Sequence, residues 1–213
     1  MTFDNFIKII PKIKETEIDS NASHLKMAPS FRRHLLELTK ANYFNSKKAG
    51  VNVVFHPNNN KVYFTLILRN EYKGVHSNQI GLPGGRFENE DEDIFQTALR
   101  ETNEEIGIDP KKINLIKKLN NVYVPPSNYD IFPFMVYTTE KVEFIIDKNE
   151  VQEIINIEID QLINCNIVKT KGSQISNRYI NELVPAYKFN EHYVWGATAM
   201  ILSEVKDIFI SVL

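Results

Sequence analysis

The spacing of apolar residues changes near residue 50. Before that point, residues 3–10 place apolar side chains at helical intervals, which predicts a first helix. Residues 15–24 form a polar stretch, and residues 29–44 predict a second helix that starts near a proline. The first part of the chain is therefore expected to be helical.

After Gly50 the pattern becomes typical of strands. Segments 50–56 and 61–69 are rich in β-branched and aromatic residues and flank an asparagine-rich turn, so they predict a hairpin. Residues 150–160 fit either a helix or a strand. Further strands are predicted at 113–119, 121–125 and 131–139, and two short strands are predicted around Asn190. A short helix is predicted at 160–164. An amphipathic helix is predicted from about Ala197, and its apolar residues are Met200, Ile201, Val205, Ile208 and Ile210. Interspersed strands and helices predict a mixed sheet covered by helices.

The length of 213 residues suits one domain, which we place at residues 1–213, with residues 1–48 as a helical extension packed on it. A net charge of −2 gives no bulk attraction to nucleic acid or anionic lipid. The single cysteine, Cys165, excludes an intrachain disulfide and a cysteine-based zinc cluster. No apolar run approaches the roughly 18 residues of a membrane span, and no secretory signal is recognisable, so a cytoplasmic location without a membrane partner is expected.

The most unusual segment is RETNEEIGI, at residues 100–108. On a helix, Glu101, Glu104 and Glu105 share one face, because offsets of three and four residues return to the same side. Asp91 or Glu92 is expected to cap the helix or to lie in its first turn, and Gly107 is expected to end it. Like charges at this spacing destabilise a bare helix by a few tenths of a kcal/mol for each pair, at the order-of-magnitude level.

A divalent cation would relieve this repulsion. Mg²⁺ prefers carboxylate and phosphate oxygens, and the preceding GLPGGR segment has glycines that let the main chain approach a ligand closely. A glycine-rich loop that leads into an acidic helix can therefore hold metal and phosphate together. The alternative is a solvated acidic face with no ligand.

These residues resemble the Nudix box, a pattern in which Arg-Glu-apolar-X-Glu-Glu-X-Gly-apolar follows an upstream glycine and glutamate. Residues 100–108 match it position by position, except that Thr102 occupies an apolar slot. Seven residues separate Glu92 from Arg100, as in the pattern, whereas six rather than five separate Gly85 from Glu92. Asp91 could therefore take the place of Glu92. The resemblance implies an α+β fold, an α/β/α sandwich in which a mixed sheet lies between helices and the box forms loop–helix–loop.

The upstream segment is similar to the coenzyme A pyrophosphatase branch of that family. The matching residues are Leu66, Arg69, Gln79, Pro83, Gly84 and Gly85, whereas Ile67, Gly74, Asn78 and Leu82 depart from the usual branch pattern. The resemblance implies hydrolysis of coenzyme A, or of a derivative, to 4′-phosphopantetheine and adenosine 3′,5′-bisphosphate. It also implies a homodimer, by analogy, and a small nucleotide as the partner.

Residue roles follow from the same resemblance. Glu101, Glu104 and Glu105, together with the carbonyl of Gly85, are expected to bind Mg²⁺ or Mn²⁺. Arg100 is expected to orient Glu101. The general base is expected to be Glu150, with Glu153 as the alternative, and the expected substrate contacts are Arg69, His76 and Arg86.

Two other functions remain open at this stage. The first is a Nudix pyrophosphatase with another substrate, such as ADP-ribose, a dinucleoside polyphosphate or an oxidised nucleotide. The second is a Nudix-fold sensor that binds a nucleotide without catalysis. Three intact glutamates argue against the sensor, because a binding module does not need three metal-binding acids.

Overall fold

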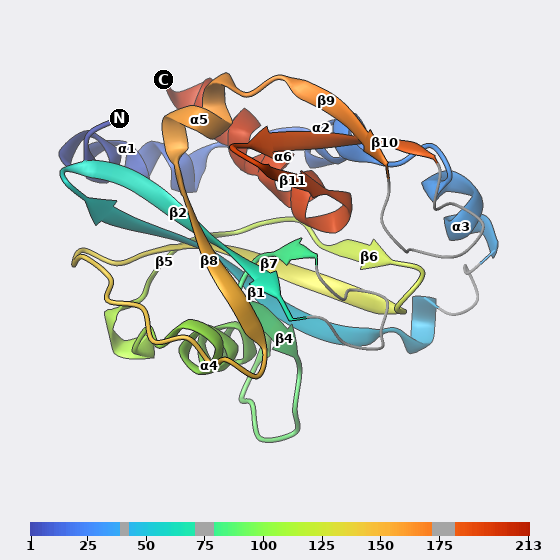
Figure 1. The fold of residues 1–213 in the computed structure, drawn as a ribbon, viewed down its shortest axis with the longest axis horizontal. Coiled ribbons are helices and arrows are strands. Elements are labelled where there is room, and N and C mark those ends of the chain that lie inside the picture. Colours follow the sequence, from blue (N-terminus) through green and yellow to red (C-terminus); the bar gives the residue numbers. More distant parts are fainter. Residues whose placement is uncertain (39–42, 71–78, 172–181) are drawn as a thin grey trace.

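The structure is a computed structural model that describes residues 1–38, 43–70, 79–171 and 182–213 (Figure 1). Its helices are α1 (Phe3–Glu15), α2 (Ser20–Met27), α3 (Arg32–Leu38), α4 (Ile94–Ile106), α5 (Ile159–Asn164) and α6 (Gly196–Val212), with short 3₁₀ turns η1 (Tyr43–Asn45) and η2 (Pro110–Lys112). Its strands are β1 (Lys47–Asn58), β2 (Lys61–Arg69), β3 (Ile80–Gly81), β4 (Gly84–Arg86), β5 (Asn114–Lys118), β6 (Val122–Val124), β7 (Tyr129–Tyr137), β8 (Val151–Glu158), β9 (Ile167–Lys171), β10 (Leu183–Phe189) and β11 (His192–Trp195).

The predicted hairpin is the centre of the main sheet. Strands β1 and β2 pair antiparallel across a turn in which Asn59 and Asn60 both have positive φ, a conformation that asparagine tolerates better than most residues. On its other edge β1 pairs parallel with β7. The main order is β3-β2-β1-β7-β5, with β4, β6 and β8 paired to β1, β7 and β2. The sheet is therefore mixed.

Helices cover both faces of this sheet (Figure 1). Helix α4 packs against β1 on one face, and a buried cluster that includes Val54, Ala98 and Ile106 fills that interface. A larger cluster on the other face joins the sheet to α1 and α6, for example through Phe6 and Phe209. The predicted sandwich, a mixed sheet between helical layers, is confirmed.

The carboxyl-terminal part settles one prediction that the sequence left open and adds one strand that was not predicted. The ambiguous segment 150–160 forms strand β8 from Val151 and then begins helix α5 at Ile159. The two short strands predicted around Asn190 are confirmed as β10 and β11, and β9 joins them in a second sheet of order β11-β10-β9. Strand β9 was not predicted, because three of its five residues are polar and its positions alternate between exposed and half-buried, with none fully buried.

The polar stretch at 15–24 also contains the start of a helix that was not predicted. Helix α2 starts at Ser20, with the Asp19 carboxylate accepting a hydrogen bond from the Ala22 N–H at 3.0 Å. Its buried side is largely polar, and its partners lie on α6: His24 Nε2 lies 2.7 Å from Glu204 Oε2. The spacing of apolar residues could not predict this helix, because its buried contacts are made by polar side chains.

Helix α6 is confirmed, but it is less amphipathic than predicted. It contacts α1, α2 and α5 as well as β6, β10 and β11, so buried residues surround most of it. Phe209 packs on Phe55 of β1 with ring centroids 5.6 Å apart, which confirms contact with the sheet. The prediction that Ile210 faces the core is wrong: it is 53% exposed, whereas the preceding Ile208 and Phe209 are buried.

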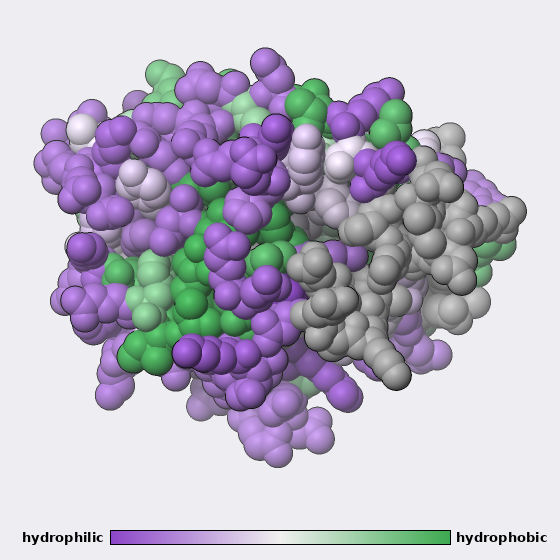
Figure 2. All heavy atoms as spheres, in the orientation of Figure 1, coloured by the Kyte–Doolittle hydropathy of each residue, from purple (hydrophilic) through white to green (hydrophobic). Residues whose placement is uncertain are grey.

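The visible surface is mainly hydrophilic. Figure 2 shows hydrophobic residues gathered over β2 and β8 on the face it views, with hydrophilic residues around them. Among the described residues, none of the helices is both long and apolar enough to cross a membrane.

The contact between α4 and β1 depends on Gly50. A Cβ at this position would lie 2.3 Å from the Ile94 carbonyl oxygen and 3.0 Å from the Ala98 nitrogen, so α4 would have to move. We expect Gly50→Ala to lower the free energy of unfolding by about 1–3 kcal/mol, measured by urea denaturation. Gly81→Ala is the control, since a Cβ there meets nothing within 4 Å. An equal effect of the two substitutions would contradict this packing account.

Candidate active site

The acidic helix has well-defined ends. Asp93 is the N-cap residue, and its carboxylate accepts hydrogen bonds from the N–H groups of Phe95 and Gln96 at 2.8 and 2.9 Å. The expectation that Asp91 or Glu92 caps the helix or lies in its first turn is therefore wrong, because the cap is Asp93 and α4 begins at Ile94. Gly107 ends it in the left-handed conformation, with φ of 75°, as predicted.

Two of the box glutamates meet a carboxylate from another part of the chain. Oxygen atoms of Glu101, Glu105 and Glu150 lie within 4.8 Å of one another. Glu150 comes just before β8, where its carbonyl accepts a hydrogen bond from the Asn70 N–H at 3.0 Å. The Asp147 N–H also donates to the Glu105 carbonyl at 3.1 Å, which ties this segment to the end of α4.

Glu105 is the most buried member of the group, with no exposed surface. Its Oε2 accepts a hydrogen bond from the Gly84 N–H at 2.8 Å. Its Oε1 lies 3.3 Å from Arg69 Nη2 but makes no hydrogen bond. Burial raises the pKa of Glu105 to about 7, and the Arg69 charge only partly opposes this.

Glu101 lies directly against the glycine loop. A Cβ on Gly85 would come within 2.3 Å of Glu101 Oε2, so only glycine allows this approach without a shift of the carboxylate. Burial raises the pKa of Glu101, and the hydrogen bond from Arg100 opposes that shift. The backbone of β4 and the two helical carboxylates thus border the same small space.

Arg100 connects this group to the start of the helix. Its Nε and Nη2 donate to the two oxygens of Asp91 at 2.9 and 3.0 Å. Its Nη1 donates to Glu101 Oε1 at 2.9 Å and to Glu104 Oε2 at 3.0 Å. The hydrogen bonds from Arg100 hold the pKa of Asp91 well below its usual range. Arg100 therefore sits where it can fix the orientation of Glu101.

A divalent cation fits this arrangement of donors. Three carboxylates converge, one of their buried oxygens has no hydrogen-bond partner, and the raised pKa of Glu105 reflects a buried charge that Arg69 offsets only in part. Hard cations such as Mg²⁺ favour oxygen ligands of this kind. Glu101, Glu105 and Glu150 are the residues that would hold the ion.

The other residues singled out from the sequence lie in different positions. The Glu104 side chain is 55% exposed and pairs with Arg100, outside the three-carboxylate group. Glu92 is exposed, and Glu153 is 51% exposed with an oxygen 3.8 Å from His192 Nε2. His76 lies outside the described residues. Their roles stay predictions.

Thr102, which occupies an apolar slot of the box, has a partner in β1. The Nδ2 of buried Asn52 donates to the Thr102 hydroxyl at 2.9 Å and to the Ala98 carbonyl at 2.9 Å. The hydroxyl in turn donates to the Ala98 carbonyl at 2.6 Å. A polar residue on the buried side of α4 is therefore matched by a polar residue on the strand beneath it.

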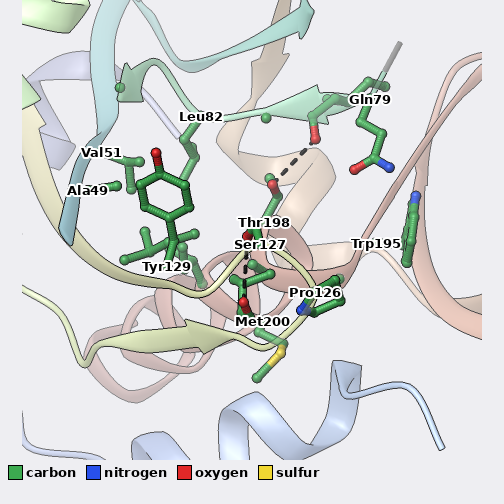
Figure 3. Close-up of a pocket in the computed structure, with 18 of the residues that line it drawn as sticks. Ala49, Val51, Gln79, Leu82, Pro126, Ser127, Tyr129, Trp195, Thr198 and Met200 are labelled. Carbon is green, nitrogen blue, oxygen red and sulfur yellow. Dashed lines mark hydrogen bonds between the residues drawn. The ribbon is translucent and has the colours of Figure 1, made fainter. Parts of the chain in front are cut away.

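Two of the three acids, Glu101 and Glu150, line a pocket of about 460 Å³. Arg69, Arg86, Glu101 and Glu150 line one part of it, together with the glycines of β4. In Figure 3, Tyr129 lies beside Ala49 and Val51, across the pocket from Gln79 and Trp195. Thr198 donates a hydrogen bond to the Ile80 carbonyl at 3.3 Å, which joins the start of α6 to β3. The remaining wall comes from α3, the β6–β7 turn and α6.

Sequence reasoning missed most of this wall. The chain contains one tryptophan, Trp195, a residue type that is typical of core packing, yet it lines the pocket. Pro125 and Pro126 form part of the wall as well as shaping the turn between β6 and β7. Arg32 of α3 is a further lining residue. The only sequence signal was a cluster of rigid and aromatic residues in segments far from the box.

Comparison with known proteins agrees with the box. A family model described as NUDIX domain matches residues 46–181. A curated relative is the "Uncharacterized Nudix hydrolase NudL" of Yersinia pestis (strain Pestoides F), 26% identical over 140 residues, which cover 65% of this chain and 69% of that protein.

Solved structures support the same fold. The Nudix hydrolase RenU from M. Smegmatis has a TM-score of 0.53 at 12% identity and covers 79% of this chain and 88% of its own. A MutT/nudix family protein from Enterococcus faecalis has a TM-score of 0.50 at 14% identity, and the match covers 92% of this chain and 76% of that protein. Since the family model spans more than half of the sequence and includes the acidic helix, the chain belongs to the Nudix domain family.

Proposed function

We propose that this protein is a metal-dependent pyrophosphohydrolase whose substrate is coenzyme A or one of its derivatives. The observation that carries the proposal is the convergence of Glu101, Glu105 and Glu150 beside a pocket that Glu101 and Glu150 line together with Arg69 and Arg86. Membership of the Nudix family supports pyrophosphate chemistry on small nucleotide derivatives. The coenzyme A assignment rests on the upstream residues that resemble that branch.

The pocket suits a long substrate of mixed polarity. Both of its acidic residues and two of its three arginines, Arg69 and Arg86, gather beside β4, whereas proline, methionine and aromatic side chains line the parts formed by the β6–β7 turn and α6. Coenzyme A combines a charged diphosphate with a long, less polar arm, and so it presents both kinds of surface. This complementarity favours coenzyme A over a shorter nucleoside diphosphate.

Each residue would have a defined role in hydrolysis. A bound Mg²⁺ or Mn²⁺ would neutralise diphosphate charge and lower the pKa of water. Glu150 is our choice of general base, because its exposed carboxylate borders the site and would give only one of its two oxygens to the ion; Glu153 remains the alternative. The water oxygen forms a bond to one phosphorus, its proton passes to the base, and the bridging bond to the leaving phosphate breaks.

Positive groups would hold the diphosphate in line. Arg69 and Arg86 line the pocket and can donate to phosphate oxygens. The Gly84 N–H and the Arg69 guanidinium also keep Glu105 in place. We propose that Arg100 positions Glu101 through their 2.9 Å contact, and that Glu104 acts as an additional ligand from the exposed side of the helix.

Substrate choice can be tested directly. With Mg²⁺ or Mn²⁺ present, we expect cleavage of coenzyme A to 4′-phosphopantetheine and adenosine 3′,5′-bisphosphate, measured by chromatography against ADP-ribose and diadenosine polyphosphates. Cleavage of ADP-ribose with coenzyme A untouched would defeat the branch assignment. Tight nucleotide binding without turnover of any compound would instead favour a sensor.

The acids can be ranked by substitution. Glu105→Gln should lower kcat by more than about 100-fold, because loss of a direct ligand costs more than loss of an outer-shell partner. Glu150→Gln should also cause a large loss. Glu104→Gln should cause a smaller one, because its carboxylate lies outside the three-carboxylate group. Circular dichroism should show an unchanged fold, and unchanged rates in Glu105→Gln would remove the group from the mechanism.

Stability without metal should depend on pH through Glu105. Its folded-state pKa of about 7 lies above the unfolded value of 4.5. The stability that this proton contributes is therefore present below pH 4.5 and is lost as the pH rises through 7. Relative to Glu105→Gln, the wild-type protein should lose on the order of 3 kcal/mol between pH 4 and 8. Urea unfolding with a chelator measures this, and parallel curves for the two proteins would contradict it.

A further inference from the structure

Arg32, on the first turn of α3, lines the same pocket as the acids although it lies far from them in the sequence. Its Nη2 donates a hydrogen bond to the Tyr123 carbonyl at 2.8 Å, next to the β6–β7 turn. This residue precedes the segment that matches the Nudix domain model, which starts at residue 46. The guanidinium is therefore a feature that the flanking part of this chain adds to the pocket.

The Arg32 charge is poorly compensated. The side chain is partly buried, and burial lowers the pKa of its guanidinium. Within the described ranges, no carboxylate oxygen lies within 4.0 Å of it. The Tyr123 carbonyl is a neutral partner and can satisfy only part of a guanidinium that has five N–H donors. Charged groups removed from water are ordinarily paired.

The pocket places this cation apart from the diphosphate site. The acids lie at α4 and β4, whereas Arg32 lies with Pro29 and Leu35 where α3 borders the pocket. Among the residues that line the pocket, the carboxylates are Glu101 and Glu150, and both belong to the metal group. A substrate whose diphosphate occupies the metal group can thus extend toward Arg32 and present a second group there.

We propose that Arg32 binds a second anionic group of the substrate, away from the diphosphate, and so determines specificity. The proposal rests on the proposed function. In a coenzyme A compound such an anion is either the phosphate on the nucleoside or a carboxylate at the end of the acyl group. A guanidinium pairs with both through two parallel N–H donors.

Two pairs of compounds separate these sources. Coenzyme A and dephospho-coenzyme A differ by the nucleoside phosphate, and succinyl-coenzyme A and acetyl-coenzyme A differ by the terminal carboxylate. In one of the two pairs, Arg32→Gln should lower kcat/KM on the order of 10- to 100-fold for the compound that carries the additional anion. The value of kcat/KM for the other compound of that pair should not change. Arg32→Lys should restore part of the preference, because the charge returns without the planar donor pair.

The control is Lys112→Gln, which removes an exposed cation paired with Glu140 at 2.7 Å. It should leave the discrimination within both pairs unchanged. The ratio within a pair is insensitive to a general loss of folded Arg32→Gln protein. Equal ratios for the wild-type protein and Arg32→Gln in both pairs would overturn the proposal.

Calorimetric binding of the same four compounds makes the test independent of turnover. If the wild-type protein cleaves none of them, the proposed function fails. The Arg32 proposal then stands only if Arg32→Gln reduces the binding preference for the anionic member of a pair, and it falls if the binding ratios do not change.

Discussion

The close approach of α4 to the glycine positions of β1 and β4 is the constraint on which the site depends. At Gly50 the helix backbone occupies the space of a side chain, and at Gly85 the Glu101 carboxylate does so. This packing brings Glu105 into the interior, where one oxygen accepts from the Gly84 N–H. The same contact that buries an unfavourable charge also creates a position at which a cation becomes favourable.

Part of the remaining wall comes from segments on either side of the matched domain, namely α3 and α6. Helix α2 is joined to α6 through Ser20 and His24, both of which contact Glu204. The Asn120 N–H also donates to Glu204, at 3.2 Å, so the loop after β5 is tied to the same carboxylate. These contacts hold α6, which lines the pocket, against the amino-terminal helices. The family's shared part thus provides the acids, whereas the flanking parts shape what can lie beside them.

Local sequence signals were sufficient for the acidic helix and for the central hairpin. The glycine at 107 and the asparagines at 59 and 60 adopt the left-handed conformations that their residue types favour. Which of the adjacent glutamates is buried could not be predicted in the same way. Residues 104 and 105 differ by about 100° around the helix. The side of α4 that packs on the sheet determines that Glu105 is buried while Glu104 is exposed. Long-range contacts likewise determine the positions of Glu150 and α2, and no local pattern encodes them.

Because Glu101 and α6 line one pocket but lie far apart along the chain, their order of synthesis matters. The acidic helix and the central hairpin leave the ribosome well before α6 does. Until α6 emerges, the hydrophobic face shared by Phe6, Phe55 and Phe209 lacks one of its aromatic rings. The pocket is therefore complete only once α6, which forms part of its wall, has been translated.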